Sequence, residues 1–474
     1  MNSQQRNDIG NICHIEPAEG FPDLISLYHA NPARYPFLLE SVTQGSSEAR
    51  YDILFSFPQE SLVLDSKNGL SSSSVKTQGN DFLTNLDGWW NRCKNNTGKE
   101  NNFPRHDLEL PFQGGWFIYL GYELAGQVEP TLNLPISDTD DVVAYAVRIP
   151  AAIIRDHVTQ RCWLISEENH QEAISLMHED IALAKELKGS TSTNNLLNTI
   201  DEEDGDNYIA AVDKIRSYIV EGDVFQVNLS RQWTATLNDK VSDAELYLSL
   251  RENNPAPFSG IANYAGRSII SSSPERLISV KNGCIEARPI AGTRPRGEEL
   301  ASDHALSVEL LAHPKERAEH IMLIDLERND LGRVCKAGSI NVNELMVLES
   351  YAHVHHIVSN IRGQVRDDAS PGDIIRAVFP GGTITGCPKV RCMEIIAELE
   401  QTPRGAYTGS MGYLNRNGDM DFNILIRTMT RQGAQLQLRA GAGIVADSVA
   451  ENELTETRTK AKGLLNALGA NTSK

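Results

Sequence analysis

Ala287-Arg-Pro-Ile-Ala-Gly-Thr-Arg-Pro-Arg-Gly297 places two prolines, two glycines and three arginines around one threonine. Proline fixes φ and removes a donor, and glycine permits geometries closed to other residues, so ordering such a segment is costly unless its shape is used. Two strand patterns joined by a turn at Lys281-Asn-Gly283 come before it. We therefore expect a hairpin that delivers a loop. Arg288, Arg294 and Arg296 would attract an anion, although an ordinary charged surface loop explains the same composition.

The bulk composition indicates a globular protein of two to three domains. The chain has 474 residues, of which 40% are hydrophobic and 23% charged. Lys plus Arg is 44 and Asp plus Glu is 63, so the formal net charge is 44 − 63 = −19. This charge argues against broad nucleic-acid binding, which needs a basic surface. An anionic substrate would have to be bound by locally placed cations, amides or a metal ion.

Cysteine usage and the first residues bear on the compartment. The seven cysteines form no CxxC pair and are odd in number, which favours reduced thiols in a cytoplasmic protein. The first eight residues, Met-Asn-Ser-Gln-Gln-Arg-Asn-Asp, lack the apolar core of a signal peptide. No run approaches the roughly 18 apolar residues of a spanning helix.

Element patterns divide the chain into three parts. Residues 1–170 contain mostly strand patterns, including 50–58 and a hairpin in which the strands 141–154 and 161–165 pair across Asp156-His157. Residues 171–205 combine a helix with a segment rich in Ser, Thr, Asn and acids, which we interpret as a linker. Residues 206–468 interleave strands and helices without regular βαβ alternation. We therefore expect an α+β fold of largely antiparallel sheets, packed in a sandwich flanked by helices.

The region 206–468 has clear local signals. A helix over 206–221 ends at Gly222, and Ser242 with Glu245 forms a capping box for the next helix. Pro314 separates two further helices. The expected elements are helices at 206–221, 302–313, 315–328, 388–399 and 450–468, and strands at 224–230, 267–271 and 352–359.

The last helix carries a candidate magnesium site. Glu453, Glu456 and Lys460 are spaced by three and four residues, which places them on one face. Mg²⁺ prefers one or two carboxylates and keeps waters for an anionic ligand. A solvated face with a Glu–Lys pair explains the same spacing. Glu319 is a third carboxylate of interest because it begins an apolar stretch, although an acid in the first turn of an amphipathic helix would look alike.

Other motifs suggest binding or acid–base roles. The segment Phe379–Lys389 resembles a phosphate loop but fails the Walker pattern, because Cys387 and Pro388 stand between Gly386 and the lysine. Free amides near Thr385 and Gly386 could still hold a carboxylate. Glycines 441 and 443 indicate a close backbone approach, to a ligand or within a tightly packed sheet.

Two further candidates are an acid and a histidine. Glu275 follows Ser273-Pro274 and is a candidate general acid or base, unless it pairs with Arg276 or another arginine. The trio His353, His355 and His356 lacks the cysteines or acids of a zinc site, so we expect one of them at most to orient a hydroxyl.

Taken together, these motifs resemble the chorismate-utilising enzymes and occur in that family's order. The resemblance covers about 205–465 strongly and the first 165 residues more weakly. The motifs are Asp223-Val-Phe-Gln-Val-Asn-Leu-Ser230, Ser273-Pro-Glu275, Pro289-Ile-Ala-Gly-Thr293, Ala318-Glu-His320, His356, Gly382-Thr-Ile-Thr-Gly386 with Pro388-Lys389, Gly441-Ala-Gly443, and Glu453, Glu456 and Lys460.

Within the family, four places resemble the aminodeoxychorismate branch and one resembles the anthranilate branch. The one is Ala291, which stands where the best-known aminodeoxychorismate enzymes carry a nucleophilic lysine. A covalent step through a lysine at this position is therefore excluded. The four are Asn228, Gly382-Thr-Ile-Thr-Gly386, Pro255-Ala-Pro-Phe-Ser259 and Pro111-Phe-Gln-Gly-Gly115.

The resemblance implies that chorismate and ammonia give 4-amino-4-deoxychorismate, for 4-aminobenzoate and folate biosynthesis. The chain has no glutaminase signature, so a glutamine amidotransferase subunit would supply the ammonia. Glu319 and Glu456 would hold Mg²⁺, with Glu453 helping through water. Glu275 would be the acid or base near the 4-hydroxyl, which His356 would orient. Lys460 would pair with carboxylates near the metal, and substrate would contact Thr293, Thr385, Tyr407, Arg427, Gly441 and Gly443.

Three alternatives remain open. The first is an anthranilate synthase large subunit, which makes anthranilate and pyruvate for tryptophan biosynthesis. The second is an isochorismate or salicylate synthase, but Gln226 stands where those enzymes use a lysine. The third is a non-catalytic regulator that binds chorismate or tryptophan. Leu38-Leu-Glu-Ser41 resembles a tryptophan-binding segment of the family, so tryptophan is a possible ligand of the amino-terminal region.

Overall fold

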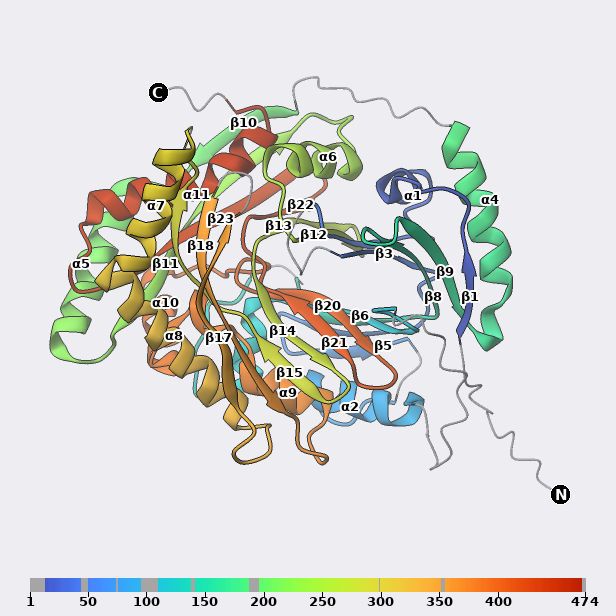
Figure 1. Ribbon diagram of the computed structural model, residues 1–474, viewed down its shortest axis with the longest axis horizontal. Coiled ribbons are helices and arrows are strands. Elements are labelled where there is room, and N and C mark those ends of the chain that lie inside the picture. The colour runs from blue at the N-terminus through green and yellow to red at the C-terminus, as the bar shows by residue number, and fades with distance from the viewer. Residues whose placement is uncertain are drawn as a thin grey trace.

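Two antiparallel β-sheets face each other, and helices cover their outer faces (Figure 1). The computed structural model describes residues 13–43, 50–73, 76–94, 110–137, 141–186, 196–297, 299–350 and 354–470. Both sheets combine strands from the first 170 residues with strands from the rest of the chain. The α+β sandwich expected from the sequence is confirmed.

Within the described residues, the first sheet has 12 strands and carries the two long strands β11 and β23 near one end. Its order is β1-β9-β8-β3-β2-β12-β13-β22-β23-β11-β10, and β19 pairs with the beginning of β11. The bounds are β1 Cys13–Pro17, β2 Phe37–Glu40, β3 Tyr51–Ser56, β8 Ala151–Asp156, β9 Arg161–Glu167, β10 Leu197–Glu202, β11 Gln226–Leu237, β12 Phe258–Tyr264, β13 Arg267–Ser273, β19 Gly386–Cys387, β22 Thr428–Gln432 and β23 Gln435–Ile444.

Over the same described ranges, the second sheet has 11 strands, in the order β16-β18-β15-β14-β21-β20-β6-β7-β4-β5, and β17 pairs with β18. The bounds are β4 Ser61–Asp65, β5 Leu70–Ser72, β6 Gly115–Leu120, β7 Val142–Ile149, β14 Arg276–Lys281, β15 Cys284–Ala287, β16 Ile290–Pro295, β17 Asn341–Ser350, β18 Val354–Gln364, β20 Ser410–Asn415 and β21 Met420–Asn423.

Helices pack on both outer faces and close one end of the sandwich (Figure 1). Helices α1, α4, α6 and α11 cover the first sheet, and α2, α8 and α9 cover the second. The bounds are α1 Leu24–Ala30, α2 Phe82–Cys93, α3 Ala125–Val128, α4 Glu172–Glu186, α5 Gly205–Glu221, α6 Asp243–Asn253, α7 Leu300–Ala312, α8 Pro314–Gly332, α9 Pro371–Val378, α10 Lys389–Glu400 and α11 Ala450–Ala467, with 3₁₀ turns η1 Tyr122–Leu124, η2 Glu168–His170 and η3 Gly382–Ile384.

The core between the sheets is aromatic. Phe37 of the first sheet stacks on Phe117 of the second, with ring centroids 4.1 Å apart. Buried phenylalanine and tyrosine side chains of β2, β3, β6 and β7 continue this layer. Aromatic pairs contribute about 0.5–1.5 kcal/mol beyond their buried area, so this layer fixes how the two sheets face each other.

Three local expectations were wrong. The segment after the β14–β15 hairpin is not a loop, because Ile290–Pro295 forms strand β16 and pairs with β18. Part of the expected linker, Leu197–Glu202, is strand β10, whose partner β11 satisfies its backbone. The strand expected across 141–154 is two strands, β7 and β8, which lie in different sheets on either side of Pro150.

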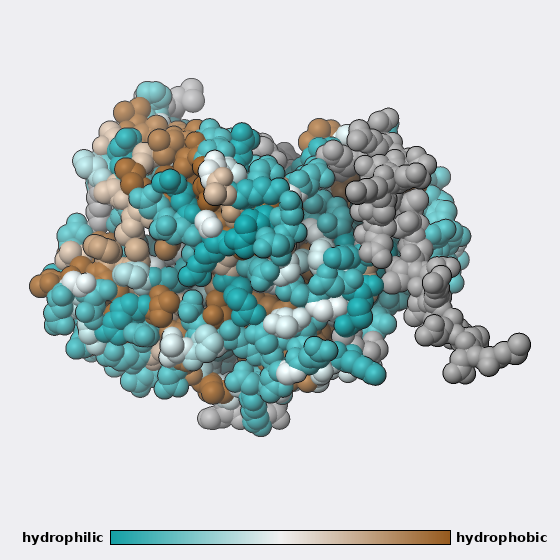
Figure 2. Space-filling model, turned by 90° about the horizontal axis from the view of Figure 1, so that it is seen from below, coloured by the Kyte–Doolittle hydropathy of each residue, from teal (hydrophilic) through white to brown (hydrophobic). Residues whose placement is uncertain are grey.

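The surface seen from below is mostly hydrophilic, and apolar groups gather toward the end that carries α5 and α8 (Figure 2). Among the described residues, no helix is long and apolar enough to cross a membrane. A cytoplasmic location stays a prediction.

Candidate active site

Strands β11 and β23 lie side by side and bring two side-chain amides against two glycines. Asn228 pairs in register with Gly443. A β-carbon at Gly443 would lie 2.3 Å from Nε2 of Gln226, and one at Gly441 would lie 2.8 Å from the Tyr407 hydroxyl. Neither position can take a side chain without rearrangement. Within the described chain, the side-chain oxygens of Gln226 and Asn228 are buried without a hydrogen-bond partner, so each can accept from a ligand.

Glu275 lies in the turn before β14, where the backbone fixes its position. Its amide donates to Oγ of Ser273 over 3.2 Å, and its carbonyl accepts from the Ile424 amide over 3.0 Å. The side chain is only 6% exposed. It does not use the neighbouring cation, because Arg276 pairs with Asp421 at 3.0 Å. The salt-bridge interpretation of Glu275 with Arg276 is therefore wrong.

The environment of Glu275 raises the pKa of its carboxyl group. Burial raises the pKa of Glu275 to about 7, against the lowering effects of the Thr383 hydroxyl, the Ile290 amide and the charges of Arg427 and Lys460. A carboxylic acid with a pKa near 7 is suited to donate a proton at physiological pH.

His356 lies on β18, opposite the bulge in β16. Gly292 has φ +76°, and the pairing register shifts between Ala291 and Thr293, which lies opposite His356. Burial, reinforced by the positive charge of Arg427, lowers the pKa of His356 to about 4. The imidazole is therefore neutral at pH 7. The side chain of Thr293 lies outside the described residues, so its predicted substrate contact stays a prediction.

The other two histidines have different outcomes. His355 is buried, and its ring contacts Asp303 at 2.9 Å and the Ser350 hydroxyl at 2.7 Å. It therefore belongs to the scaffold. His353 lies outside the described residues.

Arg427 lies at the centre of the predicted residues. It has φ +53°. Burial lowers the pKa of Arg427, and the opposing influences come from Tyr407, Glu456 and Glu275. Its own charge acts in turn on the pKa of His356. These electrostatic couplings place residues from four separate segments, those of Tyr407, Glu456, Glu275 and His356, around one guanidinium.

Helix α11 contributes the cation Lys460 to the site. Lys460 Nζ lies 2.7 Å from Oε1 of Glu456 and donates to the Gly441 carbonyl over 3.0 Å. The predicted Glu–Lys pair is confirmed. The second contact ties α11 to β23, so Lys460 is more than part of a solvated face.

The carboxylates of α11 fit a partial magnesium site. Mg²⁺ takes one or two protein carboxylates and completes its shell with water and substrate oxygens. Glu453 and Glu456 share the face of α11 that Lys460 anchors to the site, which meets this requirement. Among the described residues, no three His, Cys, Asp or Glu side chains are close enough to hold an ion between them. An all-protein cage therefore does not fit.

Two predicted residues lie on the surrounding elements. Thr385 is fully buried, and its hydroxyl donates to the Gly381 carbonyl over 2.9 Å. Its own carbonyl accepts from the Asn228 amide over 2.9 Å, so Thr385 holds the 381–386 turn against β11. Glu319 is half-buried on α8, which packs against β16 and β18. Their predicted contacts with substrate and metal stay predictions.

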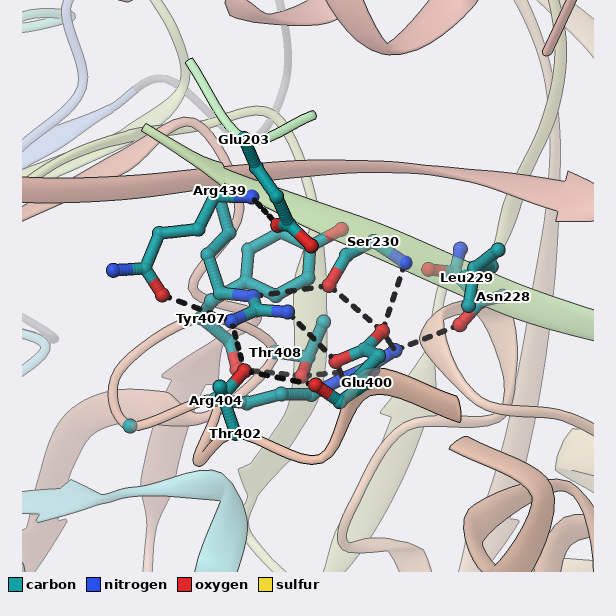
Figure 3. Close-up of polar contacts among 12 residues, drawn as sticks. Glu203, Asn228, Leu229, Ser230, Glu400, Thr402, Arg404, Tyr407, Thr408 and Arg439 are labelled. Carbon is teal, nitrogen blue, oxygen red and sulfur yellow. Dashed lines mark hydrogen bonds and ion pairs between the residues drawn. The ribbon is translucent and has the colours of Figure 1, made fainter. Parts of the chain in front are cut away.

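A buried charge cluster behind the site was not foreseen (Figure 3). Glu400 accepts from Arg404 over 2.6 Å, from Arg439 over 3.0 Å and from the Ser230 hydroxyl over 2.8 Å. All four side chains are nearly inaccessible. The cluster ties α10, β11 and β23 to the loop that carries Tyr407. The only sequence signal was the spacing of four between Glu400 and Arg404.

The arginines of the 287–297 segment are not available to an anion as expected. Each is paired with carboxylates from α7, α8 or β17, so the segment is held by its own protein. The pairs are Arg288 with Glu344 and Glu349, Arg294 with Glu316 and Glu309, and Arg296 with Asp303.

Two cavities adjoin these regions. The larger, of about 900 Å³, is lined by Arg404, Tyr407 and Arg439 but not by Glu275. We place the site at the acids and not in this cavity, because the reacting groups converge there. A smaller cavity, of about 370 Å³, is bordered by Ser41 and Phe258, where the sequence resembles a tryptophan-binding segment.

The fold and the site indicate an α+β enzyme with a buried carboxyl group, Glu275, whose pKa of about 7 allows it to exchange a proton at physiological pH. Comparison with known proteins gives the family. The sequence pattern of the family described as "chorismate binding enzyme" matches residues 40–466. The chain belongs to this family and acts on chorismate.

Individual relatives carry several names. The chain is 40% identical over 453 residues to "Aminodeoxychorismate synthase component 1" of Bacillus subtilis, covering 93% of both chains. It is 37% identical to "Anthranilate synthase component 1" of Acetivibrio thermocellus, covering 91% of this chain and 90% of the relative. The crystal structure of anthranilate synthase component I from Streptococcus pneumoniae has a TM-score of 0.75 at 30% identity, covering 89% of this chain and 93% of that chain.

Proposed function

We propose that the protein is the large subunit of an aminodeoxychorismate synthase, which converts chorismate and ammonia to 4-amino-4-deoxychorismate. The observation that carries the proposal is the pair of unpartnered amide oxygens of Gln226 and Asn228. These neutral acceptors can bind the N–H groups of ammonia, but they are too weakly basic to activate water. They therefore favour amination over hydroxylation. The pattern of Asn228 and the 382–386 turn, together with the Bacillus subtilis relative, favours position 4.

In this proposal the residues of the site divide the work between proton transfer and binding. Glu275 gives its proton to the departing 4-hydroxyl, since its pKa of about 7 leaves much of it protonated. His356, neutral because its pKa is about 4, orients the same hydroxyl. Arg427 and Tyr407 hold a substrate carboxylate, with the amides of Gly441 and Gly443 beside them. The positive charge of Lys460 offsets the negative charge of Glu456, with which it forms an ion pair.

Glu319 and Glu456 would hold the Mg²⁺ ion, with Glu453 acting through water. When bound, the ion supplies positive charge for a substrate carboxylate and for departure of the hydroxyl. A chain of net charge −19 then attracts a dianion locally, because salt screens more distant charges beyond about 10 Å.

The second candidate is an anthranilate synthase large subunit, and Ala291 favours it. Ala291 is 8% exposed on β16 and offers no nucleophile. Under our proposal ammonia adds to the ring directly. The branches differ in product, so a product assay separates them.

The test is incubation of the purified chain with chorismate, Mg²⁺ and an ammonium salt, followed by chromatography of the products. We expect 4-amino-4-deoxychorismate, and we expect glutamine to fail as nitrogen source until a glutamine amidotransferase subunit is added. The Glu275→Gln variant provides the background rate. Anthranilate as the sole product would overturn the assignment.

We also propose that tryptophan binds in the smaller cavity, next to Ser41. Its lining combines the apolar Phe258 and Met411 with the buried carboxyl of Glu40, which suits an amphipathic ligand. Isothermal titration with L-tryptophan tests this proposal, with Ser41→Tyr as the variant expected to abolish binding. Binding that Ser41→Tyr leaves unchanged would place the ligand elsewhere.

A further inference from the structure

Glu123 connects the first part of the chain to the turn that carries Tyr407. It lies in the 3₁₀ turn η1, just after strand β6. Oε1 of Glu123 accepts from the Arg404 amide over 2.7 Å. The Gly405 amide donates to both carboxylate oxygens, over 3.2 Å to Oε1 and over 3.1 Å to Oε2. Among the hydrogen bonds of the described residues, the Glu123 carboxylate therefore accepts from two backbone amides of one turn.

The backbones of η1 and of this turn are in direct contact. The Tyr122 amide donates to the Gly405 carbonyl over 2.9 Å. Gly405 has φ +59°, a conformation that glycine adopts at little cost. A β-carbon at Gly409, where the chain leaves the turn, would lie 2.3 Å from the Leu120 carbonyl oxygen. The first part of the chain therefore defines where the 404–407 turn lies.

The 404–407 turn reaches the candidate active site through two side chains (Figure 3). The Arg404 guanidinium donates to the Asn228 carbonyl over 2.7 Å. A β-carbon at Gly441 would lie 2.8 Å from the Tyr407 hydroxyl and 3.0 Å from Oδ1 of Asn228. The Tyr407 hydroxyl and the unpartnered amide oxygen of Asn228 thus lie beside the same glycine.

Two acids hold the 404–407 turn in different ways. Glu400 pairs with the Arg404 guanidinium at 2.6 Å, whereas Glu123 binds the backbone. The Tyr407 amide in turn donates to the Arg404 carbonyl over 3.1 Å, so Tyr407 extends from the backbone that Glu123 holds. Glu123, Arg404 and Tyr407 also line the larger cavity. On that side hydrogen bonds, and not packed side chains, hold the turn in place.

We propose that Glu123 is a positioning residue for the reaction: it holds the backbone of Arg404 and Gly405 and thereby keeps the Tyr407 hydroxyl beside Gly441. Glu123 acts through the turn and needs no contact with substrate. The inference rests on the proposed role of Tyr407 in binding a substrate carboxylate, but not on which ring position is aminated.

The first experiment measures kcat and KM for chorismate in the wild type, in Glu123→Ala, in Tyr407→Phe and in the double variant. Alanine leaves both amides without their acceptor, so KM should rise about three- to tenfold, with kcat changed less than about threefold. In the Tyr407→Phe background, Glu123→Ala should raise KM by less than about twofold, because two changes that act through one hydroxyl are not additive. Equal increases in both backgrounds would overturn the proposal.

Two conservative variants separate positioning from a general loss of structure. Because Oε1 alone accepts from both amides, Glu123→Gln keeps the acceptor and should hold KM within about twofold of the wild type. Glu123→Asp withdraws the carboxylate by one methylene and should give an intermediate KM, and it provides the same test if Glu123→Ala does not fold. A Glu123→Gln protein as impaired as Glu123→Ala, or a Glu123→Asp protein with wild-type KM, would contradict the proposed geometry.

Glu129→Ala is the matched control. Glu129 follows helix α3, on the segment that continues from η1, and its side chain makes no hydrogen bond among the described contacts. This variant should leave KM unchanged. Product identity is recorded in the same assay. If the wild type makes anthranilate, the proposed function fails while the comparison of KM values remains valid.

A second measurement does not depend on turnover. Amide hydrogen exchange, followed by mass spectrometry, reports how firmly the 404–407 turn is held. We expect exchange in this turn to be about tenfold faster or more in Glu123→Ala, because the Arg404 and Gly405 amides lose their acceptor. Strand β20 should exchange as in the wild type, and so should the turn in Glu129→Ala. Unchanged exchange of the turn in Glu123→Ala would overturn the proposal even if the variant were inactive.

Discussion

Two buried clusters border the site, one around Glu400 and one around Glu275. They differ in whether the carboxyl group is paired with cations. Glu400 is surrounded by Arg404, Arg439 and the Ser230 hydroxyl. Burial alone would raise the pKa of Glu400, but the charges of the two arginines outweigh it and the pKa is lowered. Glu275 is just as buried but has no ion pair at hydrogen-bond distance among the described contacts, and its pKa is raised to about 7.

The difference distinguishes a carboxylate that stabilises the structure from a carboxyl group that can transfer a proton. A buried carboxylate that is fully paired holds its neighbours in place and keeps its charge at any physiological pH. A buried carboxyl without such a pair can exchange its proton near pH 7, at a cost in stability. The Glu400 cluster positions the Tyr407 loop and β23, whereas Glu275 and its turn are available for proton transfer.

The largest expected effect is on kcat and concerns Glu275, the buried carboxyl without an ion pair. Glu275→Gln should lower kcat by about 10²- to 10⁴-fold, because the proton donor is lost. Its unfolding free energy should stay level or rise, since a poorly solvated acid is removed. Steady-state chorismate consumption and urea unfolding measure the two quantities. Glu252→Gln, an exposed acid on α6, is the control. Retained activity in Glu275→Gln would remove Glu275 from the mechanism.

At Glu400, the carboxylate paired with arginines, the main effect should be on stability. Glu400→Gln leaves two buried arginines without their counter-ion, so the unfolding free energy should fall by about 3–5 kcal/mol. Glu398→Gln, two residues away, removes a surface acceptor that lies 2.8 Å from the Tyr218 hydroxyl and should cost about 1 kcal/mol or less. Urea titration compares them. A Glu400→Gln protein as stable as the wild type would mean that the pairs contribute no net support.

The pH dependence of stability should have opposite signs in the two clusters. The folded-state pKa of Glu275 is about 7, above the ordinary value of 4.5, so the folded protein binds more protons between these limits. The stability of the wild type relative to Glu275→Gln should therefore fall by about 3 kcal/mol as pH rises from 4.5 to 7. Urea unfolding at several pH values measures this difference.

Glu400 provides the contrast, because its pKa is lowered in the folded state. Its contribution is present above the unfolded pKa, which is near 4.5, and is lost as pH falls through the folded value. The stability of the wild type relative to Glu400→Gln should therefore shrink in acid. The same sign for both variants would contradict the comparison.

Local signals in the sequence predicted much of the fold. The capping box of Ser242 and Glu245 is present at the start of α6. Gly222 ends α5 in the left-handed conformation, with φ +88°, and Pro314 begins α8. Each of these signals acts within one turn of helix, so neighbouring residues suffice to specify the outcome.

Long-range pairing could not be predicted in the same way. Arg288 looked free because its partners, Glu344 and Glu349, lie 56 and 61 residues further along the chain. The polar segment Leu197–Glu202 looked like a linker, yet β11 gives it a strand partner. The burial of Glu327 could not be predicted either. It lies in a charged helix, and only the packing of α8 against η3 shows that it is buried.

The smallest expected effect concerns Tyr407, which links the two clusters. Its ring centroid lies 5.5 Å from the Arg404 guanidinium, while its hydroxyl approaches Gly441 on the site side. Tyr407→Phe keeps the ring on the cation and removes only the hydroxyl. The unfolding free energy should change by less than about 0.5 kcal/mol, whereas KM for chorismate should rise about three- to tenfold with the loss of one hydrogen bond.

Tyr413→Phe makes the same chemical change at a buried tyrosine beside the smaller cavity, and it should leave KM unchanged. The two variants are compared by steady-state kinetics and urea unfolding under one set of conditions. If Tyr407→Phe lost several kcal/mol, its hydroxyl would belong with the Glu400 cluster as support. If KM did not move, the hydroxyl would not face substrate. Only a rise in KM at constant stability places Tyr407 where the supporting cluster ends and the reacting site begins.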